Sequence, residues 1–183
     1  DVYKRQVPDS LVSRSSVLMS RVNMMDGTST ISRSLQRARG AIRTTFRNGA
    51  LDRLFHSGSA KALLPRSYGT ASEVVLVNTA GGITGGDTFT YETGADASDV
   101  TVTTQAAERA YRSNGDEPAR LDVKLSARNG ANLHWLPQET ILFDHSRLAR
   151  RIDVDLDRDS ECLILESLVF GRHAMGETLS QCQ

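Results

Sequence analysis

The 183-residue sequence predicts a mainly β domain with one or two short helices. Short segments of Val, Leu, Ile, Thr and aromatic residues recur through the second half of the chain. Apolar and polar side chains alternate within them, as in residues 121–125 and 152–156, which is the period of a strand with one buried face. Turn signals such as Asn129-Gly130 separate these segments at roughly 8 to 12 residues, the spacing typical of an all-β domain.

The N-terminal segment carries little structural signal. Residues 1–32 are rich in Ser, Thr, Asn and Met without periodicity, which predicts an arm outside the domain. Within this arm, residues 1–6 have the look of a sequence artefact. The domain itself is predicted to span residues 33–183.

Two elements are predicted at the start of the domain. A strand or an irregular ribbon is expected over residues 34–45, because the apolar positions are too sparse for a helix and Gly40 lies among arginines. The apolar residues of segment 50–55 fall at helical intervals, which predicts a short helix that ends at Gly58.

The rest of the domain is predicted to consist of strands and one further helix. The expected strands cover residues 73–78, 88–92, 100–104, 120–126, 131–136, 149–156 and 161–170. The second helix is expected over residues 105–112, where Ala, Glu and Arg favour two helical turns.

The charge distribution is uneven although the formal net charge is zero. A nucleic-acid binder would carry a basic excess, so this class is excluded. Residues 1–67 hold 12 basic and 4 acidic side chains, a net +8, whereas residues 68–183 hold 10 and 18, a net −8. Either the basic segment packs against the acidic body or is solvated, or it forms a docking surface for an acidic partner.

Cysteine content and hydropathy indicate a cytoplasmic protein. Cys162 lies in an apolar run and is predicted to be a core residue, and Cys182 lies near the end of the sequence, so the two form no disulfide framework. No stretch approaches the roughly 18 apolar residues of a membrane span, and no signal peptide is recognisable at the start.

A glycine-rich loop is the densest local motif. It comprises Gly81, Gly82, Gly85, Gly86 and Asp87 between two predicted strands. Glycines can free backbone N–H groups to hold a phosphate, but the loop has no Gly-Lys-Ser/Thr sequence and precedes a strand instead of a helix. The alternative is a tight connection in which the glycines allow a close backbone approach.

Three further blocks place polar side chains near predicted strand ends. In residues 104–112, buried Gln and Glu side chains would satisfy backbone groups. Glu139 could be catalytic, line a polar channel or simply cap a turn. Glu166 interrupts an apolar strand, and its burial would demand a partner such as Arg172.

Metal and hydrolase motifs are weak. His173, Met175 and Glu177 could be transient ligands of a borderline metal, but the four histidines are scattered and predict no closed metal site. The sequence has no G-x-S-x-G motif and no cysteine in a nucleophile context.

These blocks, in this order, resemble the urease accessory protein UreD family, also called UreH. The resemblance rests on Leu64-Pro65-Arg66, Val77 to Asp87, Thr104 to Ser113, Leu136 to Phe143 and Phe170 to Glu177. It covers about residues 34–178, most of the chain.

The resemblance implies a non-enzymatic urease maturation scaffold whose strands stack in a helix-like or two-layer β architecture. Such a protein would bind apo-urease and, with UreF and the GTPase UreG, assist nickel insertion. Nickel would be transient cargo, and no tightly bound cofactor is expected. Members of the family continue past Glu177 with further strands, so the domain is expected to be incomplete at its C-terminal end.

The resemblance also implies roles for individual residues. The expected lining of a nickel passage is Glu139, Asp144, Glu166, His173 and Glu177. The glycine-rich loop would shape the fold around that passage. A partner contact or polar network is expected from Gln105, Glu108, Arg109, Tyr111 and Arg172. The alternative function is a β-rich enzyme or small-anion-binding domain that uses loop 80–87 and Glu139.

Overall fold

A computed structural model describes residues 36–66, 69, 71–172 and 175–183, so the predicted arm over residues 1–32 lies outside the described residues. The prediction of a mainly β domain is confirmed, and the described residues contain no α-helix. The strands are β1 (Arg39–Arg47), β2 (Ala50–Gly58), β3 (Ala60–Leu63), β4 (Ser72–Asn78), β5 (Thr88–Asp96), β6 (Asp99–Thr104), β7 (Glu108–Ala110), β8 (Ala119–Arg128), β9 (Asn132–Trp135), β10 (Thr140–Leu142), β11 (Leu148–Leu156), β12 (Glu161–Ile164) and β13 (Leu168–Phe170).

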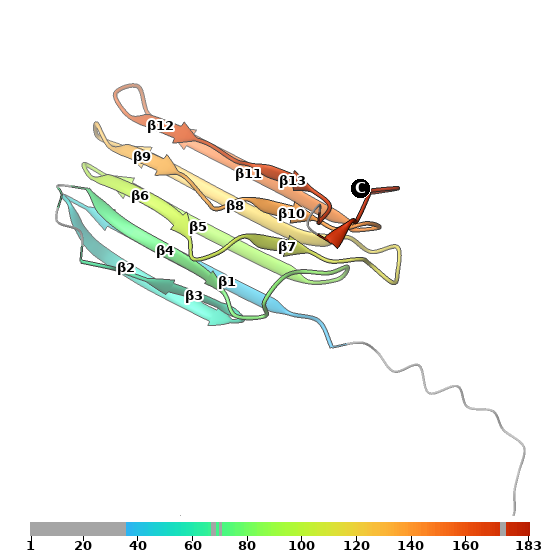
Figure 1. Ribbon diagram of the computed structural model, residues 1–183. Coiled ribbons are helices and arrows are strands. Elements are labelled where there is room, and N and C mark those ends of the chain that lie inside the picture. The colour runs from blue at the N-terminus through green and yellow to red at the C-terminus, as the bar shows by residue number, and fades with distance from the viewer. Residues whose placement is uncertain (1–35, 67–68, 70, 173–174) are drawn as a thin grey trace, which may run out of the picture. The chain divides into compact units, whose positions relative to one another are not determined.

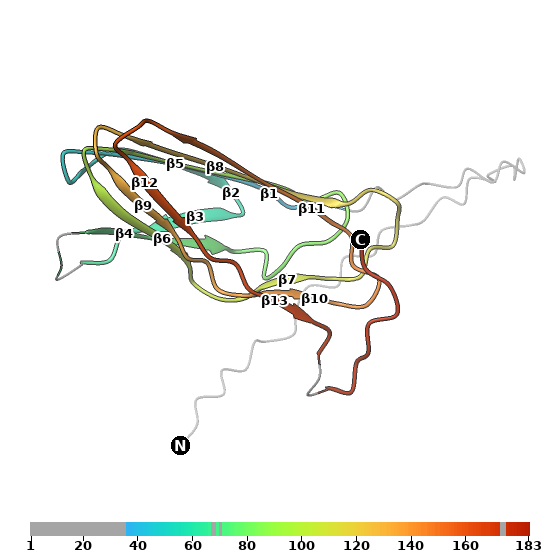
Figure 2. The same ribbon diagram turned by 90° about the horizontal axis from the view of Figure 1, so that it is seen from above.

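The strands form three sheets (Figure 1). Sheet A has the order β11-β8-β5-β1-β2, sheet B has β12-β9-β6-β4-β3, and sheet C has β13-β10-β7. Sheet A forms one layer, and sheets B and C lie opposite it (Figure 2).

From β6 onward the chain visits sheets B, C and A in turn, so β6, β7 and β8 make one coil and β9, β10 and β11 make the next. Successive coils pair in parallel, as where Thr88 of β5 faces Arg120 of β8 and Arg120 faces Ala149 of β11. The helix-like stacking that the resemblance implied is therefore confirmed.

The first predicted helix is wrong, because residues 50–55 belong to β2, which pairs antiparallel with β1. Asn48 and Gly49 connect the two strands with φ angles of 49° and 75°. Two positive φ angles in an Asn-Gly pair are the signature of a tight hairpin turn. The turn sequence therefore outweighs the helical spacing of the apolar residues that follow it.

The second predicted helix is also wrong, and this segment contains β7 in place of two helical turns. The backbone N–H of Glu108 donates to the carbonyl of Glu139, and the carbonyl of Arg109 accepts from the N–H of Ile83. These hydrogen bonds join β7 to neighbouring coils. Pairing between coils therefore overrides the local helix propensity of an Ala-rich segment.

The predicted strand over residues 161–170 is divided in two. β12 ends at Ile164 and β13 begins at Leu168, and between them the chain passes from sheet B to sheet C. Glu166 lies in the connection between these two strands, so the carboxylate does not interrupt a strand.

The core lies between the layers and follows the alternation read from the sequence. Leu121, Val123 and Leu125 of β8 are buried, as predicted for one face of this strand. Trp135 and Phe46 are among the largest fully buried side chains. Cys162 is partly buried against this core.

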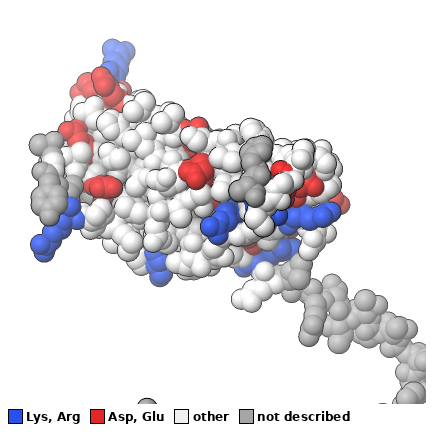
Figure 3. All heavy atoms as spheres, viewed as in Figure 1, with Lys and Arg blue, Asp and Glu red and all other residues white. Residues whose placement is uncertain are grey.

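The outer face of sheet A carries ion pairs that cross the strands. Glu92 of β5 lies 2.9 Å from Arg43 of β1 and 3.3 Å from Lys124 of β8, and Arg47 pairs with Asp96 at 3.3 Å. Two arginines of the basic segment thus contact the acidic body, which supports the packing interpretation for these residues. Figure 3 shows the opposite face of the domain, on the side of sheets B and C, where a broad uncharged area lies between charges of both signs at the two ends.

Among the described residues, no helix has the length and apolar character needed to span a bilayer.

Candidate functional site

A set of buried and partly buried polar side chains connects several strands of the domain. We call it the interior polar cluster, and its members come from β4, β5, β7, β9, β10, β11 and the β12–β13 connection. They are Asn78, Tyr91, Glu108, Trp135, Thr140, Arg150 and Glu166.

Glu108 forms one end of the interior polar cluster. The side-chain amide of Asn78 donates to both of its carboxylate oxygens, at 3.1 and 3.3 Å, and also to the carbonyl of Gly82 at 3.2 Å. Burial raises the pKa of Glu108, while the hydrogen bond from Asn78 and the charge of Arg150 act against that rise. No ion pair to Glu108 occurs in the part of the chain that the structure describes.

A cavity of about 100 Å³ adjoins Glu108 and opens behind the glycine-rich loop. Asn78, Tyr91 and Thr104 also line it, and Gln105 lies at its edge with an exposed side chain. Burial and the charge of Glu108 both raise the pKa of the Tyr91 hydroxyl, so this phenol stays protonated at any physiological pH.

Arg150 and Glu166 form the other end of the cluster. One terminal guanidinium nitrogen of Arg150 contacts a Glu166 carboxylate oxygen, and the other donates to the Thr140 hydroxyl at 3.1 Å. The indole N–H of Trp135 donates to the same Glu166 oxygen at 2.8 Å. The Nε atom of Arg150 is buried without a hydrogen-bond partner among the described residues.

The predicted pairing of Glu166 with Arg172 is wrong, since Arg150 occupies that place. Arg172 instead contacts Glu177 at 2.8 Å, and its guanidinium lies 4.5 Å from the centre of the Phe143 ring. The hydrogen bonds from Arg172 lower the pKa of Glu177 and tie it to its own loop.

The glycine-rich loop packs tightly against the 109–118 segment. A side chain at Gly82 or Gly85 would collide with backbone or side-chain atoms of that segment. Asp87 is buried and accepts from the N–H groups of Ala38 and Thr84, both at 2.8 Å. These contacts make the loop a junction between coils.

The remaining predicted passage residues are spread along the sheet C side. Asp144 accepts three hydrogen bonds from Ser180 and Gln181, which lower its pKa to about 2. The carbonyl of Glu139 accepts from the N–H of Glu108. His173 lies outside the described residues.

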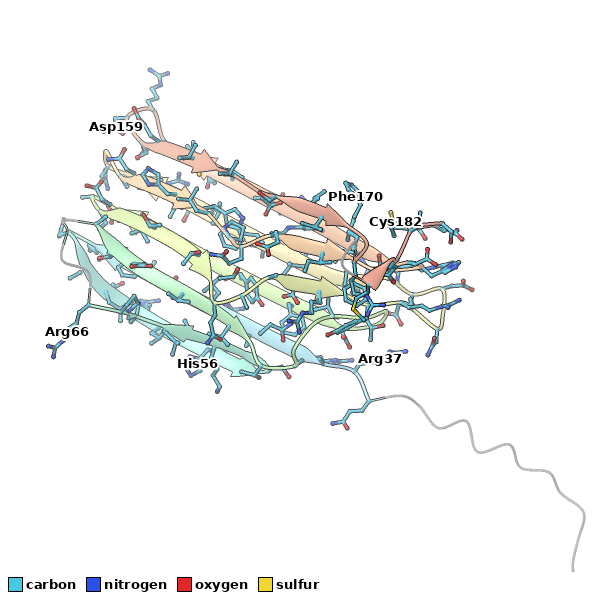
Figure 4. The ribbon with its side chains drawn as sticks, in the orientation of Figure 1. Arg37, His56, Arg66, Asp159, Phe170 and Cys182 are labelled. Carbon is cyan, nitrogen blue, oxygen red and sulfur yellow. The ribbon has the colours of Figure 1, made fainter. Side chains whose placement is uncertain are left out.

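The structure does not bring the predicted residues into a closed metal site. The described ranges contain no group of three or more His, Cys, Asp and Glu side chains that could hold a metal ion. Three residues of metal-binding types that Figure 4 labels, His56, Asp159 and Cys182, lie in different parts of the domain. Of the residues expected in a polar network, Arg109 and Gln105 are exposed, and the Tyr111 hydroxyl donates to the Gly81 carbonyl at 3.1 Å.

Sequence reasoning missed Tyr91 and Arg150, although a signal for both was present. In β11, Arg150 shares its strand face with Leu148 and Ile152, so strict alternation places its charge inside the domain. Tyr91 alternates in the same way with the buried Phe89. An inward-facing Arg in a regular strand is the more informative of the two signals, since a buried charge requires a partner.

Glu108→Gln is expected to stabilise the protein at pH 8 by about 1 kcal/mol, which raises Tm by about 2–4 °C in a domain of this size. A carboxyl group whose pKa is raised by folding costs stability at pH values above that pKa. The cost disappears as the pH falls towards the ordinary value of 4.5, so the advantage of the variant should vanish near pH 4. The measurement is thermal unfolding at both pH values. Glu161→Gln, at an exposed position, is the control, and a less stable Glu108→Gln variant at pH 8 would contradict the argument.

Asp144→Asn is expected to loosen the C-terminal segment. Because the pKa of Asp144 is lowered, its contribution is present above its ordinary value of 3.8 and lost as the pH falls towards 2. Amide exchange at Ser180 and Gln181 should therefore quicken about threefold to tenfold in the variant at pH 6. Asp116→Asn, at a fully exposed carboxylate, serves as the control. Unchanged exchange at Ser180 in Asp144→Asn would refute this assignment.

The family model of the UreD urease accessory protein matches residues 36–183. The urease accessory protein UreD of Jannaschia sp. is 51% identical over 144 residues, which are 79% of this chain and 54% of that protein. Its counterpart in Ruegeria pomeroyi is 49% identical over 135 residues, covering 73% of this chain and 52% of the relative.

A third relative, the urease accessory protein UreD of Chelativorans sp., is 49% identical over 149 residues, or 79% of this chain and 53% of its own length. The chain thus spans about half the length of these curated relatives. The family model covers the whole described β domain, glycine-rich loop and interior polar cluster included. The chain therefore belongs to the UreD urease accessory protein family.

Proposed function

We propose that this chain acts as a non-enzymatic scaffold in urease maturation, which binds apo-urease together with UreF and the GTPase UreG in the cytoplasm and assists nickel insertion. Membership of the UreD family supports involvement in urease maturation, and the relatives are named accessory proteins. Partner binding and nickel handling are the parts that this proposal adds.

The interior polar cluster is the observation that carries the nickel-handling part. Carboxylate and guanidinium groups cost free energy when they leave water without a partner, and Glu108 has no cationic contact among the described residues. A route for a hard or borderline divalent cation needs oxygen ligands inside the protein, and they must bind weakly enough to release the ion. The interior polar cluster supplies such groups between the sheets, with Glu108 at one end and Glu166 at the other.

The other passage candidates are included in the same proposal. Glu139 adjoins the interior polar cluster through its backbone, and Asp144 and Glu177 lie in local hydrogen-bonded loops. Together with Glu166 and His173, they are proposed to be transient contacts of nickel as cargo. No resident cofactor is proposed.

The glycine-rich loop offers little to an anion-binding alternative. The N–H of Ile83 donates to Arg109, that of Thr84 donates to Asp87, and that of Gly86 donates to Pro118. A phosphate cradle needs several adjacent N–H groups free to point at the ligand. The loop's amides are largely used within the fold, which favours the scaffold role.

Reconstitution of urease tests the proposal. Apo-urease, UreF, UreG, nickel, bicarbonate and GTP are incubated with and without the 183-residue chain, and urease activity is measured over time. We expect more active urease with the chain present, and co-purification of the chain with apo-urease and its partners. Equal activity in both samples, together with no co-purification, would overturn the scaffold role.

A further inference from the structure

Both ends of the coil stack present strand edges that pair with no other described strand. Sheet A ends in β2 on one side and in β11 on the other, and sheet B ends correspondingly in β3 and in β12. We call the β2–β3 end the head and the β11–β12 end the tail, and the two lie on opposite sides of the domain in Figure 1. An unpaired strand edge is a site where a further chain can add by hydrogen bonding.

The strand directions allow the tail of one copy of the chain to join the head of another. β11 runs parallel to β8, β5 and β1, whereas β2 runs antiparallel to β1. A second copy displaced along the stacking axis therefore places its β2 antiparallel to β11. By the same reasoning its β3 lies antiparallel to β12. Antiparallel pairs are slightly more stable than parallel ones, so both sheets continue favourably from copy to copy in this arrangement.

Two rows of cross-strand partners in sheet A have exposed apolar side chains at both ends. One row begins at Leu54 of β2 and ends at Val154 of β11, and the other begins at Leu51 and ends at Leu156. These four side chains are 40–42% exposed, although the residues between them in each row are buried. With the rows of two copies aligned head to tail, Leu54 meets Val154 and Leu51 meets Leu156, which removes apolar surface from water.

A third row of sheet A has opposite charges at its two ends. It begins at Arg53 on β2 and ends at Asp155 on β11, with uncharged residues between them. Each has a partner in its own copy, Asp52 at 3.9 Å and Arg128 respectively, yet the two side chains are 84% and 74% exposed. In the same arrangement Arg53 of one copy lies beside Asp155 of the next. Opposite charges that face each other across neighbouring strands are favourable.

We propose that the 183-residue chain associates head to tail with further copies of itself, so that β2 of one copy extends sheet A of the next beyond β11. The contact is heterologous, because the head of one copy binds the tail of another, and each assembly keeps one free head and one free tail. Assemblies therefore grow by addition of single copies, and their mean length rises with protein concentration. This inference goes beyond the role in urease maturation and does not depend on it.

Two charge reversals test the junction by sedimentation equilibrium of the 183-residue chain alone. Arg53→Glu places an acidic residue opposite Asp155, and Asp155→Arg places a basic residue opposite Arg53. We expect each variant alone to associate at least about fivefold more weakly than the unchanged protein, because an attraction becomes a repulsion. An equimolar mixture of the two variants should associate about as strongly as the unchanged protein, because each junction between unlike copies again joins opposite charges.

The matched control is Arg120→Glu, which makes the same charge change at an exposed position of the interior strand β8 and should leave association unchanged. Leu54→Gln should weaken association about fivefold through loss of apolar contact. Circular dichroism establishes that each variant is folded. The proposal is overturned by an unchanged protein that stays monomeric at every concentration, by folded variants that associate as strongly as it does, or by a mixture that associates no better than its components.

Discussion

Arg150→Ala is expected to lower the free energy of unfolding by about 2–4 kcal/mol, a large fraction of the stability of a domain of this size. The substitution leaves Glu166 in the interior without its cation, while the indole of Trp135 still donates to it. Loss of one partner from a fully buried pair costs about 3–5 kcal/mol. The side chains here are 14% and 25% exposed, so the expected value is somewhat lower.

Urea unfolding, followed by the fluorescence of Trp135, measures the loss of free energy of unfolding. Trp135 is the single tryptophan of the chain and donates a hydrogen bond to Glu166, so its fluorescence reports on the substituted ion pair. Arg151→Ala provides the matched control, because its ion pair with Asp153 lies at the surface and should contribute less than about 1 kcal/mol. The double variant Arg150→Met with Glu166→Leu should recover much of the loss, since it removes both charges. If Arg150→Ala and Arg151→Ala lowered the free energy of unfolding equally, the buried ion pair would contribute no more to stability than the surface pair, which would contradict the prediction.

Gly82→Ala is expected to cost about 3 kcal/mol and to disturb the cavity wall. Gly82 has a φ of 149°, and a methyl group there would collide with the ring of Tyr111 and lie 2.8 Å from the carbonyl oxygen of Arg109. That carbonyl accepts the hydrogen bond from Ile83 that joins two coils, so it cannot move without breaking the pairing. Backbone strain and steric overlap therefore add.

Gly81→Ala separates these two contributions. Gly81 has a φ of 77°, but a methyl group there would meet no atom within 4 Å. Only the backbone term remains, so the expected cost is about 1 kcal/mol. Thermal unfolding of the two variants should therefore differ clearly, and equal destabilisation would show that the contact with the 109–118 segment does not constrain the loop.

The sequence was sufficient for most strands because their alternation is set by burial, as in Leu121, Val123 and Leu125 of β8. The two helix predictions failed for different reasons. Residues 50–55 are an edge strand whose side chains are exposed, so burial imposes no strict alternation there. The segment around Glu108 is strand only through hydrogen bonds to residues some 30 positions away, which local propensity cannot register.

The site was less predictable than the fold for a similar reason. The sequence predicts that the Glu166 carboxylate needs a cation and indicates Arg172, which lies close in sequence, whereas the structure pairs Glu166 with Arg150. The true partner, Arg150, comes from a strand in another sheet. Arg150 precedes Glu166 by 16 residues, about half a coil, so the packing of sheet A against the opposite layer brings the two side chains together, which sequence proximity does not indicate.

The coil architecture also determines how the protein loses structure. Each strand of sheets A and B hydrogen-bonds mainly to the coil before and after it, so stability is close to a sum of nearest-neighbour terms, as in repeat proteins. β5 and β8 have neighbours on both sides, whereas β2 and β11 lie at the edges of sheet A. Amide exchange in the native state should then be faster at β2 and β11 than at β5 and β8.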